Sequence, residues 1–192
     1  MRKIGKLCFM VGCLLVAGSF MLFLSVRLTV ARAQTRNAAV VERICNYLPP
    51  LQPGVQENYS NMTMPLLEID GSDYVALLDI PALGLTLPVA DKWDKGRIIA
   101  GPRRFEGTAY DGSLVVGGAD QPGQFSGFAS LQPGSSILVT DMTGLTFHYV
   151  IDRIDRSSLA SKEILTGGNT DLTLFVRNAY GLNYLILRCV AK

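Results

Sequence analysis

The stretch Leu172-Thr-Leu-Phe-Val-Arg-Asn-Ala-Tyr-Gly-Leu-Asn-Tyr-Leu-Ile-Leu-Arg-Cys189 contains two apolar runs separated by a polar segment with Asn and Gly. Short runs of this composition, bounded by turn residues, are typical of β-strands. We expect strands over residues 172–176 and 184–190. Because side chains alternate between the two faces of a strand, Tyr184 and Cys189 should point in opposite directions.

Similar short apolar runs recur from Tyr74 onward, broken by Gly, Pro and Asp. Asp141-Met-Thr-Gly144 has the turn residues of a hairpin, and residues 124–131 could form a helical turn that closes one side. Many short strands separated by turn signals favour an all-β barrel or sandwich over a βαβ arrangement. The further expected strands are residues 74–80, 85–89, 113–117, 136–140 and 146–154.

The N-terminal region has a different character. Residues 7–26 form an uncharged run rich in Leu, Val, Phe and Met, and at ~1.5 Å per residue such a run spans roughly 30 Å, the thickness of a bilayer core. Its length favours an uncleaved signal-anchor, since the apolar part of a secretory signal is usually only about 7–15 residues long. Ala31-Arg-Ala33 leaves cleavage after Ala33 open as the alternative.

A helix is expected to follow this run over residues 31–48. Its apolar residues recur at three-to-four spacing, which predicts a buried face made by Ala38, Val41, Ile44, Cys45 and Leu48. Pro49-Pro50 ends the helix, and residues 52–65 read as a polar linker.

Charge and composition exclude several classes of function. The chain has 18 basic and 16 acidic residues, and four of the basic residues lie in the first 27 positions. The remainder is therefore slightly acidic, which argues against a nucleic-acid partner. His148 is the only histidine, so no residue cluster has zinc-site spacing, and we expect neither a metal nor a cofactor. We expect a half-exposed His148, with Phe147 and Tyr149 facing the core, and a buried Cys189; a Cys45–Cys189 disulfide stays open.

Five segments, kept in order over about residues 74–190, resemble sortases, the cysteine transpeptidases of Gram-positive cell surfaces, of class B-like or related type. The resemblance implies a sortase-like β-barrel of about seven to eight strands with short helices, preceded by an N-terminal transmembrane helix. The matching segments are residues 74–89, Ser113-Leu-Val-Val-Gly117, residues 125–134, Leu172-Thr-Leu-Phe and residues 184–189.

The resemblance also identifies three positions at which this chain lacks the sortase side chains. Gly118 stands at the histidine position, Arg177 at the cysteine position and Tyr184 at the arginine position. A cysteine transpeptidase needs a thiolate, a proton donor and a donor for the developing oxyanion. Guanidinium does not release its proton in proteins, and glycine has no side chain. We therefore expect no catalytic residues, and Cys189 should point away from this site.

The substituted groove could instead bind a ligand. Arg177, with Arg103 and Arg104 from a rim loop, could bind a carboxylate-ended peptide or another anion. Tyr184 and Asp120 are further candidate ligand-binding residues. Alternatively, Arg177 is a solvated residue paired with Asp120. Trp93 either lies beside the groove or caps the barrel.

The expectation is a membrane-anchored, catalytically inactive binding or accessory module. By resemblance, residues 1–6 are a cytoplasmic tail, 7–26 the single membrane span, 27–65 an extracellular helix and linker, and 66–192 the barrel domain. Candidate partners are sorting-signal peptides, surface or pilin-like proteins, or an active sortase. Two alternatives remain: an active transpeptidase with a non-standard site that attaches proteins to the cell wall, and a purely structural surface domain. An open groove around the three positions favours binding.

Overall fold

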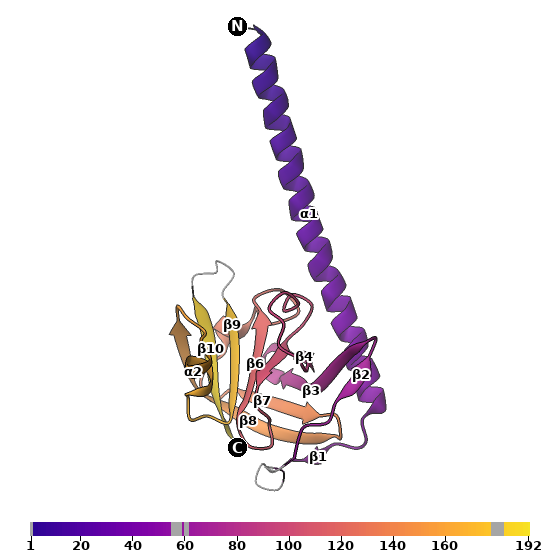
Figure 1. The fold of residues 1–192 in the computed structure, drawn as a ribbon, viewed down its shortest axis with the longest axis vertical. Coiled ribbons are helices and arrows are strands. Elements are labelled where there is room, and N and C mark those ends of the chain that lie inside the picture. Colours follow the sequence, from indigo (N-terminus) through magenta and orange to yellow (C-terminus); the bar gives the residue numbers. More distant parts are fainter. Residues whose placement is uncertain (1, 55–58, 60–61, 178–182) are drawn as a thin grey trace.

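The computed structural model describes residues 2–54, 59, 62–177 and 183–192. It consists of one long helix and a barrel of strands (Figure 1). The helices are α1 (Arg2–Tyr47) and α2 (Lys162–Thr166), with single turns of 3₁₀ helix at η2 (Pro81–Leu83) and η3 (Phe128–Ser130). The strands are β1 (Gln52–Pro53), β2 (Leu67–Ile69), β3 (Ser72–Ile80), β4 (Leu85–Ala90), β5 (Arg103–Glu106), β6 (Leu114–Ala119), β7 (Ser136–Asp141), β8 (Leu145–Ser157), β9 (Leu172–Arg177) and β10 (Tyr184–Ala191).

Eight of the described strands close into a mixed β-barrel, which confirms the expected all-β fold. The order around the barrel is β3-β4-β5-β6-β9-β10-β8-β7, and β7 pairs again with β3. The β4–β5 and β6–β9 pairs are parallel and the other six pairs of the ring are antiparallel. The two short strands β1 and β2 are added outside the ring, on β8 and β3.

Alternate side chains of these strands fill the barrel interior. The strand regions expected from the sequence are all present, and their inward residues, such as Val116, Phe147 and Leu187, are almost fully buried. The hairpin at residues 141–144 is also confirmed. There the Asp141 carboxylate accepts hydrogen bonds from the backbone N–H groups of Thr143 at 2.8 Å and Leu145 at 2.9 Å.

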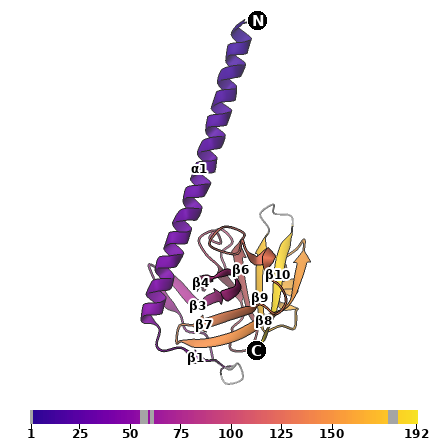
Figure 2. The ribbon, with the colours of Figure 1, turned by 180° about the vertical axis from the view of Figure 1, so that it is seen from behind.

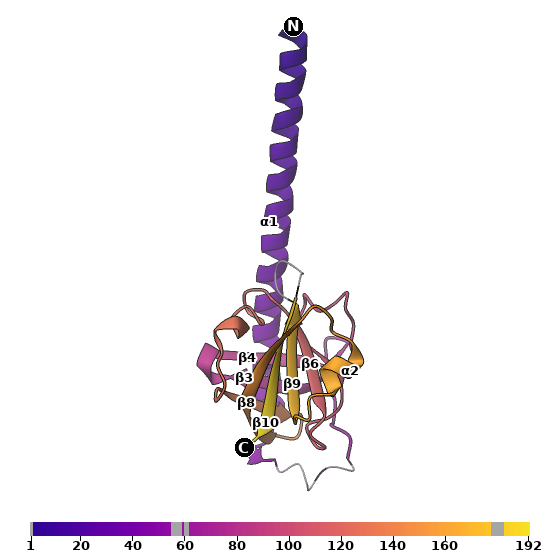
Figure 3. The same ribbon diagram turned by 90° about the vertical axis from the view of Figure 1, so that its left-hand side faces the viewer.

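Two elements near the candidate site were not expected. Arg103 and Arg104 lie in strand β5 rather than in a rim loop, so that prediction was wrong. Strand β5 is only four residues long, half-buried throughout and rich in charge, and it carries no period-two pattern. The short helix α2 lies against the outer face of β9 (Figure 3), and Ser161 caps it by accepting a hydrogen bond from the Ile164 N–H.

Helix α1 runs without interruption from the apolar segment to the barrel. Its N-terminal part projects away from the other elements (Figures 1 and 2). This part is exposed, and the helix is long and apolar enough to cross a membrane, with a mean hydropathy of 2.3 over its most apolar segment.

The last turns of α1 pack on the barrel through a stripe different from the one expected. Val40 and Ile44 contact the barrel cluster that contains Tyr74, Leu77 and Met142. The buried stripe consists of Ala33, Asn37, Val40 and Ile44, with Val41 and Leu48 at its margin, whereas Ala38 and Cys45 are exposed. The predicted three-to-four spacing of buried residues was right. The predicted buried face is displaced around the helix by about one residue, because the observed face includes the polar Asn37.

Candidate functional site

The three substituted positions lie at one end of the barrel. In the parallel β6–β9 pair, Gly118 is opposite Val176 and Ala119 is opposite Arg177. In the antiparallel β9–β10 pair, Arg177 is opposite Tyr184. The structure therefore brings Gly118, Arg177 and Tyr184 to neighbouring strand ends. It also separates them by face, since Gly118 lies on the inward side with Val176, and Arg177 and Tyr184 lie on the outward side.

The outward face beside these positions is filled by aromatic rings. Trp93, Phe105 and Phe175 pack against one another with ring centroids 5.2 to 5.7 Å apart. A Cβ atom at Gly117 would lie 2.5 Å from both Phe175 and Trp93. Trp93 thus covers the outer wall beside the substituted positions and does not cap a barrel end. No open groove remains over Gly117.

The inward side of Gly118 is occupied by Phe125. A Cβ atom at this position would lie 2.3 Å from Cδ2 and 2.4 Å from Cε2 of the Phe125 ring. Phe125 stacks on Phe128 with a centroid distance of 3.9 Å, and both rings are buried. A histidine side chain at residue 118 would therefore need Phe125 to move, and glycine here is explained by close packing.

The other candidate ligand-binding residues are divided between different places. Arg104 forms an ion pair with Asp91, and Arg103 donates a hydrogen bond to the Lys92 carbonyl at 2.8 Å. Arg103 instead lines a cavity beside α1. Arg177 is exposed.

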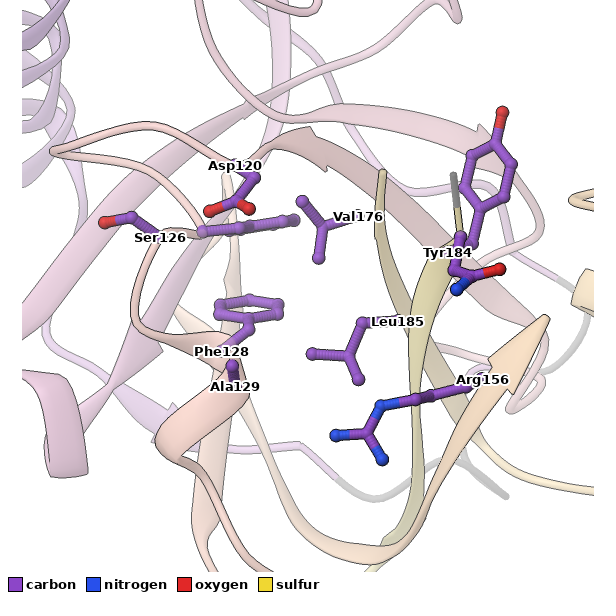
Figure 4. Close-up of a pocket in the computed structure, with 10 residues that line it drawn as sticks. Asp120, Ser126, Phe128, Ala129, Arg156, Val176, Tyr184 and Leu185 are labelled. Carbon is purple, nitrogen blue, oxygen red and sulfur yellow. The ribbon is translucent and has the colours of Figure 1, made fainter. Parts of the chain in front are cut away.

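A cavity of about 250 Å³ opens at the same end of the barrel (Figure 4). Phe128, Val176 and Leu185 face one another and form its apolar floor. The polar lining residues stand around this floor, with Asp120 and Ser126 on one side, Arg156 on the other and Tyr184 at the rim. Asn183 also lines the cavity. Figure 4 shows the Tyr184 hydroxyl pointing away from the floor. Tyr184 and Asp120 are the two sequence-derived candidates that line this cavity.

Arg156 is a site residue that sequence reasoning missed. It lies opposite Leu185 in the β8–β10 pair, so both side chains share the face that lines the cavity. Arg156 is exposed, and no hydrogen bond or ion pair joins it to another described residue. The expected strand ended at Ile154. Extending the strand's alternation of inward and outward side chains by two residues would have placed Arg156 on the same face as Ile154, which packs against the core.

The single thiol of the barrel is unsuited to catalysis. Cys189 is 0% exposed inside the barrel, and burial, followed by the nearby Asp152 charge, raises the pKa of its thiol to about 12. The prediction of a buried Cys189 is confirmed. Cys45 is exposed and both thiols are free, so the alternative of a disulfide between them is ruled out.

Among the described residues, the remaining titratable candidates form no second candidate site. Phe147 and Tyr149 face the core as expected, and His148 between them is exposed. Within the described ranges, no group of three or more His, Cys, Asp or Glu side chains could hold a metal ion.

Solved structures of sortases share this fold. The chain is similar to a Clostridium perfringens sortase D5 transpeptidase, with 23% identity and a TM-score of 0.53 over 62% of this chain and 79% of that one. Sortase C1 of Streptococcus agalactiae has 21% identity and a TM-score of 0.54 over 66% and 71% of the two chains. Sortase A of Corynebacterium diphtheriae has 19% identity and a TM-score of 0.54 over 85% and 82%. No protein-family model matches the sequence, and no curated protein matches it. At these identities the likeness establishes the fold, a closed eight-stranded sortase barrel.

Proposed function

We propose that this protein is a membrane-anchored, catalytically inactive sortase-like module that binds the carboxylate end of a peptide in the cavity at the end of its barrel. The observation that carries the proposal is the coexistence of that open cavity with a closed Gly118 position. The candidate partners are sorting-signal peptides, pilin-like or other surface proteins, and an active sortase.

Three features support inactivity. Arg177 carries a guanidinium where a sortase has its thiol, and this group cannot act as a nucleophile. Phe125 occupies the space that a side chain at Gly118 would need. Cys189 lies inside the barrel with a thiol pKa of about 12, so almost no thiolate forms near neutral pH. Within the barrel, an active transpeptidase with a non-standard site would have only this buried thiol to use.

The lining of the cavity suggests the chemistry of the ligand. The Arg156 guanidinium has no partner among the described residues, and it suits a carboxylate, with which it can form two charge-assisted hydrogen bonds. The floor of Phe128, Val176 and Leu185 suits one apolar side chain. Small-molecule pockets typically measure about 300–1,000 Å³, and this cavity, at about 250 Å³, fits one end of a longer ligand. A purely structural domain would have no need of an open, partly polar site.

For location, we propose a single-pass anchor through residues 7–26, with the barrel outside the cell as in the sortase resemblance. The exposed apolar part of α1 supports the anchor. Ala33 lies within the continuous helix and is 9% exposed, which supports the uncleaved form over cleavage after this residue.

The test uses the full chain in maltoside micelles with fluorescent sorting-signal peptides that end in a free carboxylate or an amide. We expect carboxylate peptides to bind more tightly, as measured by fluorescence anisotropy, and Arg156→Gln to weaken them about tenfold. Arg153→Gln is the matched control, because Arg153 lies on the same strand outside the cavity.

The same reaction with a nucleophilic amine present tests for turnover by mass spectrometry. We expect no ligated product. Ligation would restore the transpeptidase alternative, and a failure of every peptide to bind would favour the structural one.

A further inference from the structure

A second cavity lies between α1 and the barrel and shares no lining residue with the first. Its volume is about 360 Å³. Three arginines line it from separate segments: Arg36 from α1, Arg97 from the loop after β4, and Arg103 from β5. Three guanidinium groups around one small cavity need an explanation, because like charges repel.

Two residues that line this cavity each have a buried polar atom without a hydrogen-bond partner among the described residues. Asn37 also lines it and is 6% exposed, and its Nδ2 is buried without an acceptor. The Nε of Arg103 is likewise buried without an acceptor. Unsatisfied buried donors are costly, so two of them on residues that line one cavity point to an absent acceptor.

Asn37 is out of place as a packing residue. It lies in the buried stripe of α1, between Ala33 and Val40, where an apolar side chain would pack on the barrel at no polar cost. Its side chain lies against Gly101, where a Cβ atom would be 3.2 Å from Oδ1.

The nearby carboxylates do not balance the positive charge. Asp70 lines the cavity but pairs with Arg43 at 2.9 Å. Asp94 lies 3.6 Å from Arg97 and also accepts a hydrogen bond from the Gly96 N–H. Burial lowers the pKa of Arg103, and the Arg97 and Arg36 charges lower it further while Asp94 opposes the shift. The cavity therefore keeps an excess of positive charge.

We propose that this cavity binds a phosphate group, with Arg36, Arg97, Arg103 and the Asn37 amide as its donors. Arginine presents a planar fork of donors that matches phosphate oxygens. A carboxylate has only two oxygens, whereas the donors here come from four side chains around one space. The phosphate can belong to a lipid headgroup or to a soluble phosphate ester.

Both sources are within reach of the site. Arg36 follows the end of the apolar run at Val26 by ten residues, or about 15 Å along a helix. The headgroup layer adds roughly 5–8 Å on each side of the bilayer core, and helix tilt and the long arginine side chains shorten the remaining gap.

The first experiment is a calorimetric titration of inorganic phosphate into the full chain in maltoside micelles, with chloride used to hold ionic strength constant. We expect saturable binding that is weakened about tenfold by Arg36→Gln or by Arg97→Gln. Both side chains are exposed enough for the variants to fold. Arg32→Gln is the matched control, since it removes the same charge from the same helix outside the cavity, and it should change the affinity less than twofold.

The second experiment distinguishes the two sources by repeating the titration in nanodiscs of anionic phospholipid. Weaker binding than in micelles would identify the lipid headgroup as the occupant, and equal binding would identify a soluble phosphate ester. The proposal fails if inorganic phosphate shows no saturable binding, or if Arg32→Gln weakens it as much as Arg36→Gln does.

Discussion

Replacement of Gly118 by alanine should destabilise the barrel through contact with a single ring. The new Cβ would lie 2.3 Å from Phe125 Cδ2, whereas ordinary contacts begin at 3.4 Å, so the ring must retreat by about 1 Å. Phe125 cannot easily do so, because it is 1% exposed and stacked on Phe128. Overpacking of this kind typically costs about 1–3 kcal/mol, and the rigid stack places Gly118→Ala near the upper end.

The assay is urea unfolding of the full chain in micelles, followed by the fluorescence of Trp93, the only tryptophan. With a slope of about 2 kcal/mol per molar urea, a loss of ~2 kcal/mol lowers the midpoint by roughly 1 M. Phe125→Leu should relieve the clash, so that Gly118→Ala costs less than about 1 kcal/mol in that background. Gly134→Ala is the control, since its cost arises from a backbone φ of +90° with no neighbour within 4 Å and should be the same in both backgrounds.

Two outcomes would refute the reasoning. A fully stable Gly118→Ala variant would mean that the space beside residue 118 is not closed. An equal loss in the wild-type and Phe125→Leu backgrounds would mean that Phe125 is not the group that closes it. Only the first result would reopen this position to a catalytic side chain.

Two further predictions concern the buried thiol and the helix. In the folded protein the pKa of the Cys189 thiol is raised to about 12, so its contribution to stability is present below the unfolded pKa of about 8.5 and is lost as pH rises toward 12. Between pH 7 and 11, the urea midpoint of Cys189→Ala should therefore fall less steeply with pH than that of the wild type. An equal slope for the two proteins would contradict this. Ile44→Ala should cost about 2–4 kcal/mol and the neighbouring Cys45→Ala almost nothing, as read by the same unfolding assay, because only Ile44 is buried against the barrel; equal losses would restore the helix face predicted from the sequence.

Sequence patterns predicted the strands well because alternation and turn residues are local signals. The β7–β8 hairpin, for example, follows from Asp141 and Gly144 alone. Closure of the barrel depends on pairs distant in the sequence, such as the parallel β6–β9 pair. No local pattern encodes that pairing, so it came from the family resemblance.

The candidate site was predicted in part. The three substituted positions do meet at one barrel end, because the register of β6, β9 and β10 aligns their ends. The β6–β9 register places Gly118 opposite Val176, so Gly118 and Arg177 face opposite sides, which the groove hypothesis did not anticipate. The buried face of α1 was predicted wrongly for a physical reason. Asn37 lies on that face and is polar, so a prediction based on apolar residues alone selects a neighbouring face of the helix.

The unbroken helix α1 determines which end of the barrel lies nearer the apolar segment. Strand β10 starts beside the cavity at Tyr184 and runs toward the C-terminus, which lies at the barrel end remote from the N-terminal part of α1 (Figure 1). With that part of α1 in a bilayer, as proposed, the cavity lies at the barrel end nearer the lipid surface. A ligand would then bind close to the membrane. That geometry selects for chains that are themselves tethered to the membrane and discriminates against soluble ones, so affinities measured in micelles would understate the advantage of a tethered ligand in the cell.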